Sequence, residues 1–404
     1  MKLSGKHLLV LVAMCGLIAS GVGLVTNVAG IFFDPVATEL GIGKGQVSLT
    51  LTICNICFAL GGMLAPFFMK AKSPKPLLIA ATAALAGSTA ALSVAHSIGV
   101  IYALCVVRGF AAGVVGMVFA TSVLNNWFVE GIGLVTSIAF GCSGIAGAVF
   151  SPVMTSVIAS SGWRMGYVVM AALTVALNLP AILFLKSVTP EGCGLKALGA
   201  GKATEATPAA SAEATAENAG SISALLFLLV LAYAVICSAL TAMPQHFPGM
   251  AESFGMGALG ATMLSFAMIA NTAGKVLLGV LVDRFGARIS ILVYCALIAL
   301  SLVLLLFVHS KGAMIVASAL FGLCYALGTV GISLTTREVF GPANYTRVYP
   351  TCSLGGNFAN ATFSSIIGFM YDFSGGYVLT LWMMLALAIV TAVLIVMAFA
   401  RKAE

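Results

Sequence analysis

Arg108 and Lys275 are the two basic residues of this 404-residue chain that fall inside long apolar stretches. None of the 12 acidic residues lies near the middle of such a stretch. If the stretches cross a membrane, each charge near mid-depth costs on the order of 2.5 to 3.5 kcal/mol, so a partner must compensate it. An anion that arrives from solution would be such a partner. The two cations therefore predict a site for an organic anion inside a membrane.

Lys275 lies four residues before Gly279, which places its side chain several ångströms inside the membrane end of a helix. Asn271 is one turn earlier on the same face, and its amide can form hydrogen bonds but cannot titrate. Together the two side chains could hold a carboxylate. The alternative is a lysine whose ammonium group reaches the inner lipid headgroups from the last turns of its helix.

Other side chains could complete such a site. Phe321 and Tyr325 are four residues apart and share one helix face, where aromatic rings would keep a carboxylate site dry, or would simply pack. Arg108 could bind substrate, or it could cap backbone carbonyls beside the glycines that follow it. No second cation stands at Thr351 or Cys352, beside Ser353, which favours a monoanion. Further polar candidates for the cavity wall are Asn27, Ser353 and Asn357.

The composition places these residues in a membrane protein. The chain is 61% hydrophobic and 8% charged, whereas a soluble domain has about 25% charged residues. Twelve apolar stretches are each long enough to cross about 30 Å of hydrocarbon as a helix. They cover approximately residues 7–31, 46–68, 76–95, 99–121, 133–157, 164–185, 222–245, 257–281, 289–309, 312–335, 346–370 and 377–400. We therefore expect an all-α membrane protein with twelve transmembrane helices.

A polar segment divides the twelve stretches into two sets of six. Residues 187–220 are rich in Ala, Thr and Glu and have no hydrophobic period, which predicts a flexible linker between domains 1–186 and 221–404. Cytoplasmic loops are rich in Lys and Arg. With both termini in the cytoplasm, 14 of the 19 cations fall in inner loops and tails. These are Lys2, Lys6, Lys70, Lys72, Lys75, Lys186, Lys196, Lys202, Arg284, Arg288, Arg337, Arg347, Arg401 and Lys402. A cleaved signal peptide is disfavoured, because the first apolar stretch continues to Phe33 and eleven more follow.

Several kinds of chemistry have no basis in the sequence. The ten cysteines are scattered through apolar stretches, so no metal or redox site follows from their spacing. The four histidines lie at or beyond the ends of the stretches, and no clustered set of catalytic groups accompanies them. An enzyme is therefore disfavoured, and no cofactor is expected. His246 is expected to be a solvated residue at a helix end, or a titrating group that gates or couples transport.

One motif connects the two sets of stretches to a known family. Gly279, Asp283, Arg284, Gly286 and Arg288 fit the pattern G-x-L-x-D-R-x-G-x-R. This pattern resembles the loop motif of the major facilitator superfamily, whose fold is two pseudo-symmetric six-helix bundles. The resemblance implies a latch that helps to hold the outward-facing state. Gly279 would let neighbouring helices approach, and Asp283 would sit near a helix N-terminus and pair with arginine.

The first half carries a degraded copy of this loop. Gly62 occupies the place of Gly279, 217 residues earlier, and Pro66 replaces the aspartate. The latch is therefore expected to be asymmetric.

Within the superfamily the chain is most similar to oxalate/formate antiporters and monocarboxylate transporters. The residues that carry this resemblance are Asp34-Pro35-Val36 with Glu39-Leu40-Gly41, Asn126-Trp127-Phe128 with Gly133-Leu134, and the run from Asn271 to Gly279. It implies that Lys275 binds the substrate carboxylate and that Phe321 and Tyr325 line the cavity. Arg108 and Gly113 fit an R-x-x-x-x-G pattern that is found in several subfamilies, where it has been linked to proton or substrate coupling. Ile132 departs from the branch, which usually has arginine there.

The sequence thus predicts a secondary transporter of a small organic monocarboxylate, working by alternating access and driven by exchange or by protons. The alternatives are a drug/proton antiporter, a carrier of a larger amphipathic acid, or a sensor that does not transport. The expected partners are the organic anion, protons and the lipid bilayer, with no nucleic acid and no metal. We expect a monomer in the cell (inner) membrane with both termini in the cytoplasm.

Overall fold

A computed structural model describes residues 5–69, 73–129, 132–198 and 223–403. The predicted inner cations Lys2, Lys70, Lys72 and Lys202 lie outside these ranges, as do linker residues 199–220. The described residues form two compact units. The N-terminal unit comprises residues up to 42 together with 46–198, and the C-terminal unit comprises residues 223–403 together with 43–45.

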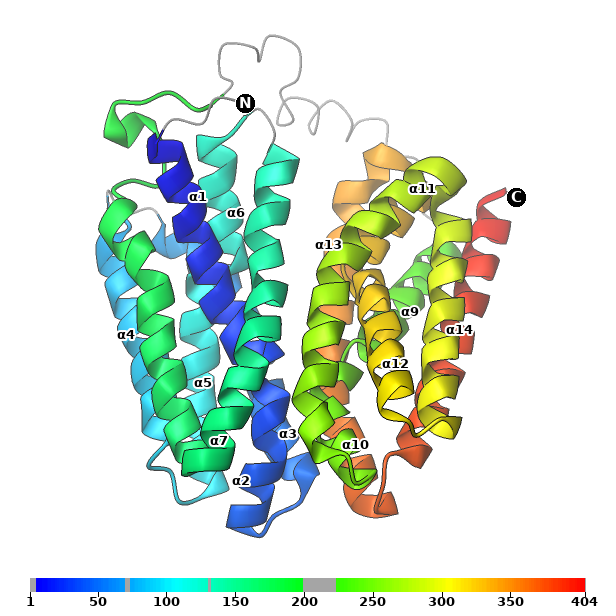
Figure 1. Cartoon of the computed structure of the whole chain (residues 1–404). Helices are drawn as coiled ribbons and strands as arrows, with labels where there is room; N and C mark the ends of the chain where they lie inside the picture. Colours follow the sequence, from blue (N-terminus) through cyan, green and yellow to red (C-terminus); the bar gives the residue numbers. More distant parts are fainter. Residues whose placement is uncertain (1–4, 70–72, 130–131, 199–222, 404) are drawn as a thin grey trace. The chain divides into compact units, whose positions relative to one another are not determined.

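Six membrane-length helical segments make up the N-terminal unit (Figure 1). Its elements are α1 (Gly5–Ile18) continuing as the π-helix η1 (Ala19–Asn27), the short η2 (Ala29–Phe32) and α2 (Phe33–Leu40), then α3 (Lys44–Phe68), α4 (Lys75–Leu92), α5 (Ile98–Val114), α6 (Met117–Trp127) and α7 (Ile132–Phe184). Gly162 splits α7 into two antiparallel spans, because its φ of 79° lies in the left-handed region that suits glycine.

The C-terminal unit repeats this plan with six more segments. Its elements are α9 (Ala224–Leu240), η4 (Met243–His246), α10 (Phe247–Ser253), α11 (Gly257–Phe307), α12 (Lys311–Cys324), η5 (Tyr325–Gly328), α13 (Val330–Ser374) and α14 (Val378–Ala403). Gly286 and Gly341, with φ of 77° and 73°, split α11 and α13. The prediction of an all-α fold with twelve membrane-spanning helices is confirmed.

The same close helix contact occurs within each of the two units. In the N-terminal unit, a Cβ added to Gly109 of α5 would overlap the backbone of Cys54 in α3, and one added to Gly61 would overlap Phe110. The C-terminal unit has the same reciprocal contact between α12 and α11. There Gly322 meets the backbone of Ala267, and Gly274 meets Leu323. Glycine lets each helix pair approach backbone to backbone.

Every pair of equivalent positions in this contact is 213 residues apart. The same separation relates the N-caps of α5 and α12, Ser97 and Ser310, and the left-handed glycines Gly162 and Gly375. The sequence pairing of Gly62 with Gly279 was therefore displaced by four residues. In the structural repeat, Gly62 corresponds to Lys275. A four-residue displacement is about one helical turn. The comparison of the two loop sequences therefore aligned the motif with its degraded copy one turn out of register.

The start of the predicted linker is folded. Leu198 pairs with both sides of the end of α6, since its N–H donates to Trp127 O and its carbonyl accepts from Val129 N, both at 2.9 Å. Val188 and Leu195 pack against the buried core of the N-terminal unit. Residues 187–198 thus cover this end of the unit, and the prediction that flexibility begins at Ser187 is wrong. The apolar residues Val188, Leu195 and Leu198 explain the difference.

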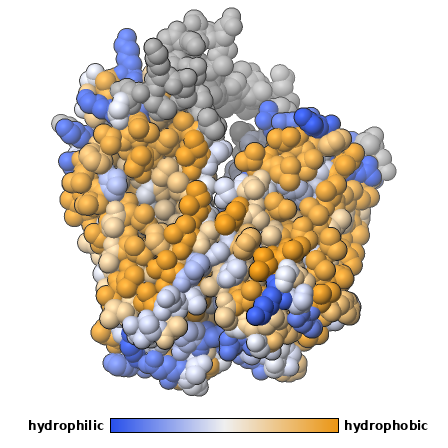
Figure 2. All heavy atoms as spheres, in the orientation of Figure 1, coloured by the Kyte–Doolittle hydropathy of each residue, from blue (hydrophilic) through white to orange (hydrophobic). Residues whose placement is uncertain are grey.

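Apolar side chains also cover much of the face of both units that Figure 2 shows. Large hydrophobic residues that are more than half exposed include Met63, Phe67, Val276, Phe307 and Phe373. Hydrophilic residues gather at the ends of the helices in Figure 2. This distribution fits helices whose outer faces contact lipid.

Candidate functional site

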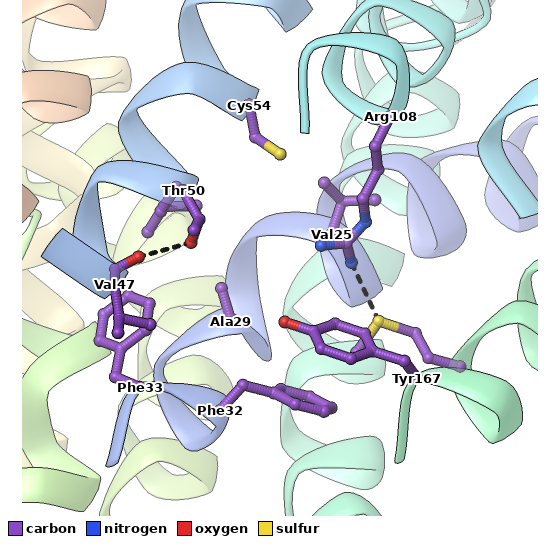
Figure 3. A pocket seen from close by; sticks show the side chains of 11 residues that line it. Val25, Ala29, Phe32, Phe33, Val47, Thr50, Cys54, Arg108 and Tyr167 are labelled. Atoms are coloured by element: carbon purple, nitrogen blue, oxygen red, sulfur yellow. Dashed lines mark hydrogen bonds between the residues drawn. The ribbon is translucent and has the colours of Figure 1, made fainter. Parts of the chain in front are cut away.

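A pocket in the N-terminal unit contains Arg108 (Figure 3). Its walls come from six elements, and the space between them is partly open to solvent. The lining residues are Val25, Ala29, Phe32, Phe33, Val47, Thr50, Leu51, Cys54, Arg108, Tyr167 and Met170.

The glycine contact between α5 and α3 positions the arginine. Gly109 and Gly113 lie against the backbones of Cys54 and Phe58, so α5 and α3 are in direct backbone contact here. Arg108 directly precedes Gly109 and is 4% exposed. Its side chain therefore enters the pocket beside Cys54.

The guanidinium group of Arg108 has few partners in the protein. Its Nη2 donates to Met170 Sδ at 2.9 Å, and its Cζ lies 5.8 Å from the centre of the Tyr167 ring. Its Nε is buried without a hydrogen-bond partner. Arg108 forms no ion pair with any described residue, and none of the lining residues is acidic. The sequence alternative, in which Arg108 caps backbone carbonyls, has no matching hydrogen bond among the described residues.

Tyr167 is a pocket residue that sequence reasoning missed. Its ring stacks on Phe32 with centroids 4.3 Å apart and planes 20° apart. The edge of Trp163 also meets it, with centroids 5.9 Å apart. In Figure 3 its hydroxyl points toward Ala29 across the pocket. The available signal in the sequence was an aromatic residue five positions after Gly162.

An ion pair secures one end of the span that carries Tyr167. Arg164 donates to a Glu39 carboxylate oxygen at 2.7 Å and to the backbone of Ala95 at 2.9 Å. Trp163 Nε1 donates to the other Glu39 oxygen. Both carboxylate oxygens of Glu39, at the end of α2, therefore accept hydrogen bonds from α7.

Lys275 and Asn271 lie on the first half of α11 in the C-terminal unit. Asn271 is 3% exposed, and its Oδ1 is buried without a hydrogen-bond partner. The Lys275 side chain is half-buried and makes no ion pair or hydrogen bond to any described residue. Its neighbour Gly274 sits against the backbone of Leu323. Lys275 thus lies beside the close contact of α11 with α12.

The predicted aromatic pair is divided between two environments. Phe321 is 1% exposed and meets Phe247 edge to face, with centroids 5.8 Å apart, so its ring is enclosed in the core of its unit. Tyr325 is half-buried and begins η5, where the α-helix ends.

The remaining polar candidates are also separated from the Arg108 pocket. Asn27 is buried, and its Nδ2 donates to Ser143 O at 2.9 Å, so its amide holds η1 against α7. Ser353 is half-buried and Asn357 is exposed, both on α13. None of the three lines the pocket around Arg108.

The latch motif has a different acidic partner from the one expected. Gly286 ends the first half of α11, and the N–H of Ala287 that follows donates to Glu338 at 2.7 Å. Asp283, Arg284 and Arg288 are exposed. The carboxylate that caps the second half of α11 therefore comes from α13 and not from Asp283.

Gly279 does not have the packing role that we expected. Apart from its chain neighbours and the adjacent backbone of its own helix, no described atom lies within 4 Å of a Cβ placed on Gly279. The close approach of α11 to α12 occurs at Gly274 instead.

His246 is not the solvated residue that the sequence indicated. It is 1% exposed, and its Nε2 lies 2.9 Å from Ser364 O in α13. The apolar segment that begins with α9 continues through η4 and α10 to Ser253, so His246 lies within this segment and not at its end. Among the described residues, no group of three or more His, Cys, Asp or Glu side chains could hold a metal ion.

Two six-helix units with a buried cation in an apolar pocket define a membrane transporter of the major facilitator fold. The family model of the Major Facilitator Superfamily matches residues 15–274 and 225–404, and the chain belongs to this superfamily. It is therefore a multi-pass membrane transporter and not an enzyme. No curated protein sequence matches the chain.

Two solved structures show the same fold. The nucleoside transporter NupG superposes with a TM-score of 0.72 and 15% identity, covering 97% of this chain and 99% of its own. A bacterial homologue of the human lysosomal transporter Spinster, in an inward-facing and occupied conformation, has a TM-score of 0.65 and 13% identity. It covers 100% of this chain and 96% of its own. At these identities the likeness concerns the fold and not the substrate.

Proposed function

We propose that the chain is a secondary transporter of an organic monocarboxylate and that Arg108 binds the substrate carboxylate. The observation that carries this proposal is the buried guanidinium group that has a thioether as its hydrogen-bond acceptor and no carboxylate partner. A charge in an apolar site is costly unless it is paired. A substrate carboxylate would supply two oxygens in the planar geometry that guanidinium recognises.

The charge of the pocket favours an anion over a cation. A carrier of cations or cationic drugs needs an acidic side chain to attract them, and none of the residues that line the pocket is acidic. The position equivalent to Arg108 in the C-terminal unit is Phe321, so this part of the repeat supplies one cation and not two. One cation suits a monoanion. The oxalate/formate and monocarboxylate branch stays part of this proposal.

Lys275 is proposed as a second cation for the anion during transport. Its equivalent in the N-terminal unit is Gly62, which lies two helical turns along α3 from Cys54, the neighbour of Arg108. Arg108 and Lys275 therefore occupy different levels of the repeat. We propose that Arg108 provides the main affinity and that Lys275 acts as the anion moves.

We further propose that the protein lies in the cell (inner) membrane with both termini in the cytoplasm, as the distribution of basic residues indicates. Transport would be driven by exchange or by a proton gradient.

The test is uptake of labelled benzoate and acetate into proteoliposomes. We expect Arg108→Gln to reduce uptake to the level of empty liposomes and Arg108→Lys to retain part of it, because lysine keeps the charge but loses the bidentate geometry. Lys311→Gln removes an exposed cation at the start of α12 and is the matched control. Wild-type uptake by Arg108→Gln would refute the assignment of Arg108. Accumulation of organic cations but no carboxylate by the wild type would refute the proposed substrate class.

A further inference from the structure

Arg108 carries a buried charge that no described side chain neutralises. It is buried and forms no ion pair with any described residue. Its Nη2 donates to the Met170 thioether at 2.9 Å, and its Nε is buried without an acceptor. A thioether is a weak acceptor and carries no charge. Because an unpaired charge is expensive to remove from water, the guanidinium group requires an anion as its partner.

The space beside the guanidinium group limits the size of that anion. The pocket has room for little more than one water molecule between its lining atoms. A substrate carboxylate would enter this space with the rest of its molecule toward the side that is open to solvent. A halide ion is a single atom that is only slightly larger than water. Chloride can therefore enter the space completely.

The hydrogen-bond donors of the pocket suit such an ion. Arg108 has donors and no acceptor. Tyr167 also lines the pocket, and its hydroxyl makes no hydrogen bond to a described residue, so its proton is available. The Thr50 hydroxyl is not available as a donor, since it donates to Val47 O at 2.6 Å. None of the residues that line the pocket is acidic, so no carboxylate there repels an anion. Water could accept the same protons, but it would leave the charge of Arg108 unpaired.

We infer that Arg108 and the Tyr167 hydroxyl form a binding site for chloride, which pairs the charge of Arg108 when no substrate is bound. Chloride and the substrate carboxylate use the same donors, so they bind in competition. Organic anions therefore bind more weakly as the chloride concentration rises. The competition rests on the proposed function, whereas the binding of chloride does not.

The test replaces sodium methanesulfonate with sodium chloride at constant ionic strength. Methanesulfonate is also monovalent, but its several heavy atoms make it too large for the space beside Arg108. Melting temperatures of the purified full-length protein in detergent give the dissociation constant of each ligand. We expect chloride and bromide to raise the melting temperature. At a chloride concentration of about ten times its dissociation constant, the apparent dissociation constant of benzoate should rise about tenfold.

Four variants assign these effects to the pocket. Arg108→Gln should lose the chloride effect, and Tyr167→Phe should weaken chloride binding about threefold or more, because one donor is lost. Arg108→Lys should keep chloride binding within about threefold while benzoate binding weakens about tenfold. The reason is that a spherical ion needs only a point charge, whereas a carboxylate uses the planar guanidinium group. Lys311→Gln removes an exposed cation and is the matched control. A melting temperature in methanesulfonate at or above that of the wild type shows that each variant folds.

Bromide also locates the site without a variant. Crystals of the wild type grown in bromide should give an anomalous-scattering peak within hydrogen-bond distance of Arg108 Nε. Density at this place without an anomalous signal would identify a water molecule and would refute the inference.

The outcomes separate this inference from the proposed function. If benzoate binds through Arg108 and chloride changes neither the melting temperature nor the benzoate affinity, the function stands and the chloride site is refuted. If chloride binds through Arg108 and no carboxylate does, the chloride site stands and the function is refuted. A chloride effect that persists in Arg108→Gln arises elsewhere on the protein and refutes the site. Binding of both ligands without competition would refute the shared donors.

Discussion

Replacing Gly109 by alanine should damage anion binding through the position of Arg108. An ideal Cβ on Gly109 lies 2.8 Å from Cys54 Cα and closer still to its carbonyl oxygen. Carbon atoms are most favourably placed at about 3.5 Å, so α5 and α3 must separate by about 0.7 Å or more. Overpacking of this kind costs about 1 to 3 kcal/mol of stability. It also moves the guanidinium group away from the carboxylate site.

The repeat provides a matched control in the other unit. A Cβ on Gly322 would lie 2.6 Å from Ala267 Cα, so Gly322→Ala creates the same overlap beside Phe321, where no cation is present. Gly87→Ala is a second control, because nothing lies within 4 Å of that position and alanine is favoured over glycine in a helix by about 1 kcal/mol.

The assay combines the melting temperature with the benzoate dissociation constant for each variant. Gly109→Ala and Gly322→Ala should both lower the melting temperature, and Gly109→Ala alone should weaken benzoate binding, by about tenfold. Gly87→Ala should leave both values unchanged or raise the melting temperature slightly. Equal loss of affinity in Gly109→Ala and Gly322→Ala would show that general destabilisation, and not the displacement of Arg108, controls binding.

Three further outcomes are expected. Lys275→Gln should abolish transport, while its melting temperature stays at the wild-type value and its benzoate affinity stays within about twofold of wild type. Lys275→Arg should still transport. Uptake by Lys275→Gln at the wild-type rate would remove Lys275 from the mechanism. Glu338→Gln should lower stability by about 0.5 to 2 kcal/mol, because it weakens the charged cap of Ala287 N. Glu191→Gln, a change at an exposed residue, should have no effect. Equal melting temperatures for Glu338→Gln and wild type would argue against the cap. Exchange of labelled for unlabelled benzoate should persist in proteoliposomes at equal pH, because no acid lines the Arg108 pocket and Asn271 cannot titrate; exchange that requires a pH gradient would reveal an essential proton site elsewhere.

The fold was predictable because membrane helices have to satisfy two strong constraints. Each must be about 20 apolar residues long, and each must satisfy its own backbone hydrogen bonds. Those constraints act on composition over long windows, so twelve segments could be recognised from the sequence. They do not act on short connections, which explains why the packed segment 187–198 was assigned to a flexible linker. Val188, Leu195 and Leu198 are too widely spaced to make a hydrophobic period.

The candidate site was predictable only in its charged residues. A buried arginine in an apolar stretch is recognisable from composition alone, and Arg108 was found in this way. Tyr167 and Phe32 were missed because an aromatic residue in a membrane helix gives no sign of which neighbour it will meet. The burial of His246 was missed because the segment that begins with α9 continues through η4 and α10 beyond the predicted end of the stretch. Contacts between distant helices depend on packing, and the sequence pattern of each helix does not specify its partner.

The repeat gives the chemical content of the site a physical explanation. A helix contact such as Gly109 with Cys54 and Gly322 with Ala267 fixes the backbone in both units and leaves the side chain next to each glycine free to vary. In one unit that side chain is Arg108, and in the other it is Phe321. A symmetric pair of arginines at these positions would favour a substrate with two carboxylates. An arginine in one unit and a buried phenylalanine in the other provide charge for a single carboxylate.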